Sequence, residues 1–280
     1  MLPSFLSAEN VDFCTANGEN ADSGSGITAR QAETLSAAGV DVITGGNHSL
    51  EKRFLWPVLQ DFPFVLRPGN FPSAGSFAGF SVQPESARLS SAEASAGDSA
   101  EESPVLPAVF PGKGTAVVEK TVAGIQRRLC VINVQGREMM RPLDCPFRYT
   151  ENALADLRAA FPGQTVPVVV DFHGESAAEK EAFCLYFDGR LSAVMGTHTH
   201  VQTADARILP GGTACLSDLG MCGPRRSVIG SLPEDSVLRA LTQVPLRMRP
   251  AEGPPAVQGC LLDLDPDSGK AVALYPVNRL

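Results

Sequence analysis

Short apolar runs, each followed by glycines or polar residues, recur along this chain. Residues 40–44, 166–170 and 191–195 are three of these runs, and their length and apolar content are typical of buried strands. Helical stretches lie between several of the runs. Because strand, polar tip and helix alternate, the pattern predicts an α/β sheet whose functional residues lie at the strand ends.

The other elements are predicted from shorter apolar runs and from helix caps. Thr28 with Gln31, and Ser176 with Glu179, have the spacing of a capping box at a helix start. We expect further strands over residues 11–16, 64–66, 115–118, 128–134, 207–209, 213–217, 246–249, 258–263 and 271–275. We expect a helix tail over residues 1–10 and helices over residues 28–39, 50–60, 150–160, 176–187 and 234–242.

Residues 73–111 break this alternation, because they are rich in Ser, Ala, Glu, Gly and Pro and show little apolar periodicity. Such a segment cannot bury enough apolar area to offset the entropy lost on ordering. We therefore predict one domain over residues 1–280 that carries a low-complexity, disordered insertion at 73–111. A functional lid is the alternative interpretation of this segment.

The overall composition is that of a globular protein, with 44% hydrophobic residues and a net charge of −8. This acidic balance argues against general binding to nucleic acid or to a membrane surface. Seven cysteines without a C-x-x-C pair fit reduced thiols in a cytoplasmic protein. We find no apolar run of about 18 residues and no signal-peptide layout, so we expect no membrane segment. A homo-oligomer is compatible with this composition.

The strongest chemical signal is an H-x-H motif, His198 and His200, which follows the apolar run 191–195 and Gly196. In an extended backbone, residues two apart project to the same side, so both rings would reach one ion or an adjacent pair of ions. The alternative is two hydrogen-bonded loop histidines. Because two close histidines after a glycine are a poor structural choice, we predict that both are metal ligands.

Further candidate ligands also follow apolar runs. His173 lies between Asp171 and Glu175 after the run 166–170, although a single histidine there is often a core residue. Glu19 also fits a turn carboxylate, and Asn47 after glycine also fits an ordinary turn. Their common position at strand ends favours the metal-binding interpretation. In an open α/β sheet such ends converge on one crevice.

Together the predicted ligands offer carboxylate, amide and imidazole groups and no thiolate; they are Glu19, Asn47, His173, His198 and His200. This mixture suits Fe, Mn, Zn or Co in an open catalytic site rather than a structural zinc site. Two such ions about 3.5–4 Å apart would stabilise both oxygens of a phosphoryl transfer. His48, next to Asn47, would then donate a proton or a hydrogen bond to the phosphate.

The chain resembles a known family, the YmdB-like metallophosphoesterases, which are relatives of the calcineurin-type phosphoesterases. The resemblance covers nearly everything outside residues 73–110. The matching segments are NGENA (17–21), GITA (26–29), GNH (46–48), RPGNFP (67–72), PGKG (111–114), NVQGR (133–137), DFHGE (171–175), the long segment 188–214 with its GTHTHVQTAD, and GMCGP (220–224).

The resemblance implies a calcineurin-like α/β sandwich, in which two β-sheets are flanked by helices. It also implies two transition-metal ions, with Fe or Mn favoured over Zn or Co, and a small phosphodiester substrate. The expected activity is hydrolysis of cyclic nucleotides, either 2′,3′- or 3′,5′-cyclic.

The resemblance implies a role for each of several residues of this chain. Glu19 would bridge the two ions, His200 would bind the second ion, and His48 would be the catalytic histidine. Asn47, His173 and His198 would surround the first ion. Asn20 is a further candidate for a contact with metal or substrate.

One departure from the family concerns the first strand, which in family members ends in a Gly-Asp that helps to hold the second ion. Here Met1 falls within what should be the following helix, and Asp12 lies at the wrong end of its strand to substitute. We expect that the true start lies upstream. The alternative is a catalytically impaired, truncated homologue that acts as a binding or regulatory protein. The ion bound by His198 keeps its full ligand set, so we expect that site to fill first.

Three arginines, Arg67, Arg137 and Arg207, lie in or near the matching segments. Each is a candidate contact for phosphate. Each is equally well explained as half of a structural ion pair.

Overall fold

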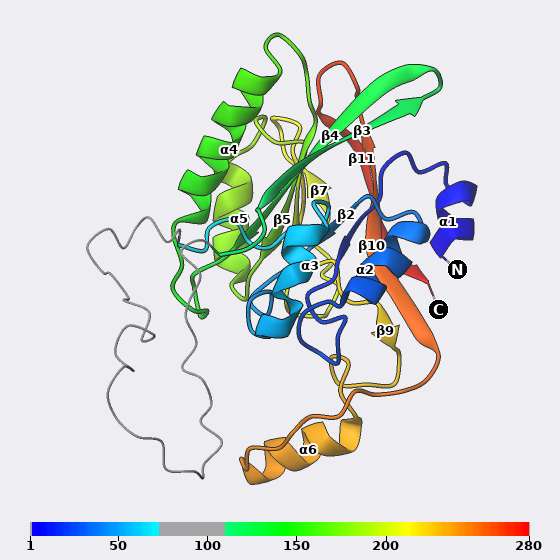
Figure 1. Ribbon diagram of the computed structural model, residues 1–280, viewed down its shortest axis with the longest axis vertical. Helices are drawn as coiled ribbons and strands as arrows, with labels where there is room; N and C mark the ends of the chain where they lie inside the picture. Colours follow the sequence, from blue (N-terminus) through cyan, green and yellow to red (C-terminus); the bar gives the residue numbers. More distant parts are fainter. Residues whose placement is uncertain (1, 73–109, 280) are drawn as a thin grey trace, which may run out of the picture.

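A six-stranded mixed sheet lies at the centre of the protein; the computed structural model describes residues 2–72 and 110–279 (Figure 1). Its strand order is β3-β4-β5-β6-β8-β7. The strands are β3 (Thr115–Val122), β4 (Ile125–Gln135), β5 (Val168–His173), β6 (Ala193–Thr197), β7 (Arg207–Ile208) and β8 (Ala214–Leu216). Strands β4, β5, β6 and β8 run parallel, and β3 and β7 are antiparallel edge strands. The central strands are buried on both faces, as expected for parallel strands covered on both sides.

A second layer of strands packs against this sheet. Strands β1 (Thr15–Asn17) and β2 (Val42–Thr44) form a parallel pair, and Val65 extends it through a bridge to Ile43. Strands β9 (Gly223–Pro224), β10 (Pro255–Leu264) and β11 (Ala271–Arg279) form an antiparallel group in the order β11-β10-β9. Apolar side chains of β2 pack on β3 and β4, and those of β10 and β11 pack on β6 and β8.

Helices cover the outer face of the central sheet and of the β1–β2 pair. Helices α4 (Pro146–Ala160) and α5 (Ala177–Tyr186) pack on the central sheet (Figure 1). Phe172, Phe183 and Phe187 are fully buried in this interface. Helices α2 (Ala29–Ala37) and α3 (Trp56–Asp61) pack on the β1–β2 pair. The other helical segments are α1 (Leu2–Ala8), η1 (Arg53–Leu55) and α6 (Pro233–Thr242). The predicted α/β sandwich with helix-flanked sheets is therefore confirmed, with its second layer divided into two groups of strands among the described residues.

Several local predictions need correction. The strand expected over 11–16 starts only at Thr15, because the Asp41 carboxylate accepts the Cys14 amide hydrogen at 2.8 Å. No strand forms over 246–249, where Arg249 instead pairs with Asp235 of α6. The predicted insertion at 73–111 lies outside the described residues except for residues 110 and 111.

The two predicted capping boxes differ. Thr28 and Gln31 form the complete reciprocal pair at the start of α2. At α5, Ser176 accepts the Glu179 amide hydrogen, but the Glu179 carboxylate accepts the backbone N–H groups of Arg137 and Glu138. The second box is therefore only half formed, because the Glu179 carboxylate bonds the backbone of a neighbouring loop instead of the backbone N–H of Ser176. Within the described part of the chain, no helix has the length and apolar character to cross a membrane.

Candidate active site

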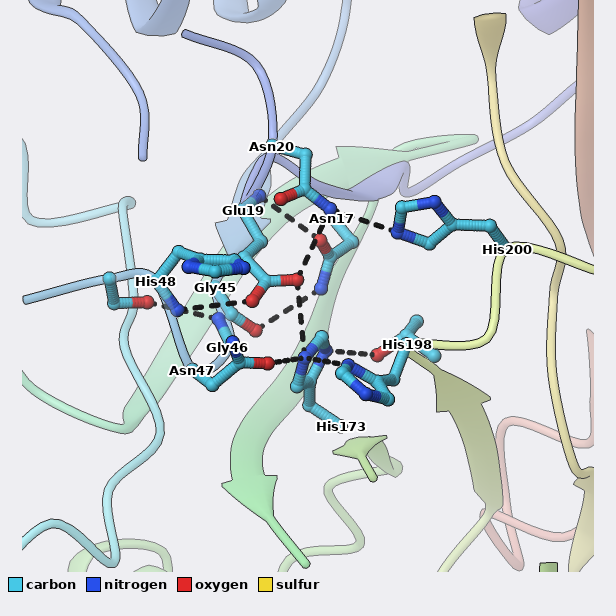
Figure 2. Close-up of polar contacts among 12 residues, drawn as sticks. Asn17, Glu19, Asn20, Gly45, Gly46, Asn47, His48, His173, His198 and His200 are labelled. Carbon is cyan, nitrogen blue, oxygen red and sulfur yellow. Dashed lines mark hydrogen bonds and ion pairs between the residues drawn. The ribbon is translucent and has the colours of Figure 1, made fainter. Parts of the chain in front are cut away.

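The polar tips of four strands meet at one place, between the two layers of strands (Figure 2). Strands β1 and β2 lead into Glu19 and into residues 45–48, while β5 ends with His173 and β6 leads into His198. Hydrogen bonds from one side chain link the two layers of strands next to this place. The Asn133 side chain bonds both the amide and the carbonyl of Gly45, at 3.0 and 3.2 Å.

Four potential ligand atoms converge on one point. His173 Nε2 lies 2.9 Å from Asn47 Oδ1, 3.1 Å from Glu19 Oε2 and 3.0 Å from His198 Nδ1 (Figure 2). Two ligand atoms about 2.1 Å from one ion lie about 3.0–3.4 Å apart at octahedral or tetrahedral angles. The spacing of these atoms therefore fits one divalent ion. The structure brings together the set predicted around the first ion, and the ligand roles themselves stay a prediction.

Glu19 is only 3% exposed and lies against the backbone of Gly46. A Cβ placed on Gly46 would lie 2.5 Å from His173 Nε2 and 2.6 Å from Glu19 Cδ, so only glycine fits there. Burial alone would raise the pKa of Glu19. The hydrogen bond and charge of His173, together with the His48 amide, outweigh burial and lower that pKa. Glu19 is therefore held as a carboxylate, the form that binds a cation.

His200 lies apart from this group, and Asn20 lies between it and Glu19 (Figure 2). Its Nδ1 donates to the Ile229 carbonyl at 2.9 Å, and its Nε2 lies 2.9 Å from Asn20 Nδ2. Asn20 Nδ2 in turn lies 3.5 Å from Glu19 Oε2. Asn20 thus occupies the space between His200 and the carboxylate predicted to bridge the two ions.

The H-x-H motif does not have the extended backbone on which the geometric expectation was based. His198 and His200 have φ angles of 113° and 64°, so the loop is not extended. This left-handed backbone is uncommon for residues other than glycine and is often found at functional sites. The two rings contact different residues, since His198 Nδ1 faces His173 Nε2 and His200 Nε2 faces Asn20 Nδ2, which is compatible with the prediction of two different ions.

His48 lies beside the cluster rather than in it. Its amide donates to Glu19 Oε1 at 3.1 Å, and its Nδ1 contacts the Glu51 carboxylate. Ser25 Oγ donates to the same Glu51 carboxylate at 2.8 Å. Glu51 was not predicted from the sequence; its position three residues after His48, within one turn, was the available signal.

Comparison with known proteins now connects this geometry to a family. The sequence matches the family described as YmdB-like protein over residues 1–88 and 104–277. The chain belongs to the YmdB-like family. It is 35% identical over 273 residues to a 2′,3′-cyclic-nucleotide 2′-phosphodiesterase of Bacillus subtilis, covering 98% of this chain and 87% of the relative.

Two solved structures resemble this YmdB-like protein. One is a hypothetical protein from Thermus thermophilus, with 33% identity and a TM-score of 0.73, covering 99% of this chain and 90% of the other. The other is a novel phosphatase from Mycoplasma pneumoniae, with 27% identity and a TM-score of 0.78, covering 99% and 85%. With these relatives, the YmdB-like protein is a phosphoesterase of mixed α/β fold.

A buried ion pair supports the H-x-H loop of this YmdB-like protein. Lys180 Nζ donates to the Thr197 carbonyl at 3.0 Å and lies 3.3 Å from Asp218 Oδ2. Asp218 accepts the Thr199 amide hydrogen at 2.8 Å. Burial lowers the pKa of Lys180, while the charge of Asp218 acts in the opposite direction. The pair therefore holds the loop on both sides of His198, through the Thr197 carbonyl and the Thr199 amide.

Breaking the Lys180–Asp218 ion pair should destabilise the folded protein. Lys180→Met is expected to lower the free energy of unfolding by about 3–5 kcal/mol, because it leaves the Asp218 charge buried without its partner. Urea unfolding followed by circular dichroism measures the loss. Lys120→Met is the matched control: its ion pair with Asp41 has side chains 38% and 15% exposed, and exposed pairs contribute about 1 kcal/mol or less. Equal losses in the two variants would contradict the supporting role of Lys180.

The three candidate arginines have different surroundings. Buried Arg67 donates to the carbonyls of Pro111 and Pro68, and Arg207 pairs with Glu181. Both are therefore structural. Arg137 is exposed and remains a candidate for contact with a phosphate.

Proposed function

We propose that this YmdB-like protein is a metal-dependent phosphodiesterase that hydrolyses 2′,3′-cyclic nucleotides. The observation that carries the proposal is the convergence of Glu19, Asn47, His173 and His198 on one point beside His48. A site of carboxylate, amide and imidazole groups without thiolate is typical of hydrolytic metal centres. The name of the Bacillus subtilis relative favours the 2′,3′-cyclic class over the 3′,5′-cyclic class.

The residues divide into two groups around Glu19. Asn47, His173 and His198 would hold one divalent ion, and His200 would hold the second, with Glu19 shared between them. Fe or Mn suits this donor set best, and Zn or Co is the alternative. When bound, such ions neutralise the phosphate charge and lower the pKa of water, so that water can attack at neutral pH.

His48 is the proton donor in this proposal. Because Glu51 engages Nδ1, the ring is oriented with Nε2 left for the substrate. The side chain is 36% exposed, so a substrate can reach it. On ring opening, the leaving ribose oxygen would take a proton from Nε2, which is the role of a general acid.

The alternative function is that of a non-catalytic homologue that binds a partner or has a regulatory role. Elemental analysis of the purified chain after incubation with Mn²⁺ separates the two functions. We expect two equivalents of metal per chain at saturation, with the His198 site filling first. A folded chain that binds no metal would refute the enzymatic proposal and favour the alternative.

A further inference from the structure

A cavity of about 600 Å³ lies beside His200, the candidate ligand of the second ion. Its walls come from the H-x-H loop, from β9, β10 and β11, and from the loop that follows β9. Binding sites for small molecules usually have volumes of about 300–1,000 Å³. His200 borders the cavity and also contacts Asn20, which lies next to Glu19. A phosphate held at this end of the ligand cluster would therefore lie at the cavity, and a group attached to that phosphate can enter it.

Part of the cavity wall is apolar. Met221, Ile229 and Ala256 line it, and Ile229 is 55% exposed. The position of Ile229 is fixed, because its carbonyl accepts a hydrogen bond from His200 Nδ1 at 2.9 Å. Exposed apolar area gains free energy when a ligand covers it. The wall is therefore suited to the flat face of a ring.

Gln258, on β10, gives the cavity a polar group of defined orientation. Its Oε1 accepts the Met221 amide hydrogen at 3.0 Å. Since the oxygen is engaged, Nε2 is the atom that remains for a ligand, and an amide nitrogen can only donate. Within the described part of the chain, Nε2 makes no hydrogen bond. Gln258 thus offers a donor, and not an acceptor, to a molecule in the cavity.

Arg225, which follows β9, adds a second donor to the cavity wall. It is exposed, and its side chain forms no hydrogen bond or ion pair with the residues that the structure describes. A guanidinium group donates hydrogen bonds from its edge and stacks on aromatic rings with its face. The two side chains therefore favour a flat ring that carries acceptors on its edge.

We propose that this cavity binds the base of a 2′,3′-cyclic nucleotide and that Gln258 selects bases with a carbonyl acceptor. Guanine carries the acceptor O6 and uracil the acceptor O4, whereas adenine and cytosine carry amino donors at the corresponding positions. An amino group would place a donor against Gln258 Nε2. The inference rests on the proposed function for the cyclic phosphate and goes beyond it by ranking the four bases.

The test is steady-state kinetics on the Mn²⁺-loaded chain with the 2′,3′-cyclic phosphates of guanosine, uridine, adenosine and cytidine. Glycerol 1,2-cyclic phosphate, a five-membered cyclic phosphate without a base, is measured in parallel. We expect kcat/KM to be about 10-fold higher for the guanosine and uridine substrates than for the other two nucleotides.

Two substitutions of Gln258 separate base selection from support of the loop. Gln258→Met should raise KM for the guanosine substrate by about 3–10-fold, with kcat unchanged and with no effect on the substrate without a base. Gln258→Glu keeps an oxygen for the Met221 amide and replaces the donor with an acceptor. Its preference should therefore shift toward adenosine and cytidine, which a purely structural role would not produce.

Gln60→Met is the matched control, because Gln60 is exposed on α3 and does not line the cavity. It should keep every KM of the wild type. If Gln258→Met does not fold, the preference of Gln258→Glu decides. Equal kcat/KM for the four nucleotides, or a loss in Gln258→Met that is as large without a base, would overturn the inference and leave the proposed function intact. A wild-type chain that hydrolyses none of the cyclic phosphates would refute the proposed function itself.

Discussion

Glu19→Gln is expected to lower kcat/KM for phosphodiester hydrolysis by about 10³-fold or more, which corresponds to about 4 kcal/mol of transition-state stabilisation. One carboxylate oxygen of Glu19 faces His173 Nε2 and the other accepts the His48 amide hydrogen. Glutamine removes the negative charge and directs an N–H₂ donor at one of these positions. The metal content should fall together with the activity. Hydrolysis of bis(p-nitrophenyl) phosphate and elemental analysis measure the two losses.

Glu33→Gln is the matched control for this substitution, because Glu33 is exposed on α2 and lies outside the loops that carry the candidate ligands. It should leave both metal content and turnover unchanged. Circular dichroism establishes that Glu19→Gln is folded before its activity is compared. A folded Glu19→Gln chain with wild-type turnover would contradict the assignment of Glu19 as the shared ligand.

His48→Ala is the second substitution with a large expected effect: turnover of a 2′,3′-cyclic nucleotide should fall by about 10²–10⁴-fold. The reason is the loss of the proton donor to the leaving ribose oxygen. Metal content should stay at the wild-type level, because the His48 side chain contacts Glu51 rather than the ligand cluster. Hydrolysis of the same substrate at saturating Mn²⁺ measures the effect.

The dependence on the leaving group makes this prediction specific. The p-nitrophenolate ion is a much weaker base than a ribose alkoxide and needs less protonation. The loss with bis(p-nitrophenyl) phosphate should therefore be smaller than the loss with the cyclic nucleotide. Glu51→Gln keeps the ring but weakens its orientation, so its turnover should lie between wild type and His48→Ala. Equal losses on the two substrates would contradict the proton-donor role.

The candidate ligands could be located from the sequence because they follow the ends of parallel strands. His173 and His198 come after apolar runs, and β5 and β6 are neighbours in the sheet, so their ends had to lie close together. Glu19 and Asn47 follow β1 and β2, which are also neighbours. The order of strands in the sheet was not predicted. The prediction that the ligands converge therefore rested only on their common position after the ends of strands.

The orientation of the side chains could not be predicted in the same way. The H-x-H spacing predicts two rings on the same side only for an extended backbone, and the positive φ angles of His198 and His200 show that the backbone is not extended. These angles depend on contacts from distant residues, such as Lys180 with the Thr197 carbonyl and Asp218 with the Thr199 amide. No local pattern at residues 196–202 indicates either partner.

The residues behind the ligands were the hardest to predict. Thr197, whose hydroxyl contacts His173 Nδ1, is the last residue of β6, and the sequence marks Asp171 only as a neighbour of His173. Asp171 contacts Asn17 and Thr44, which are 154 and 127 residues away in the sequence. A contact of this kind depends on how the two layers of strands face each other. Hydrophobic periodicity assigns a residue to a face of its own strand and does not specify the residue opposite.

The most direct test of the proposed phosphodiesterase is the turnover of 2′,3′-cyclic AMP by the purified chain, before chelation, after chelation, and after Mn²⁺ is restored, with 3′,5′-cyclic AMP assayed in parallel. We predict hydrolysis of the 2′,3′-cyclic substrate that is lost on chelation and recovered with Mn²⁺, and little hydrolysis of the 3′,5′-cyclic substrate. A folded, Mn²⁺-loaded chain that leaves 2′,3′-cyclic AMP intact would contradict the proposed function.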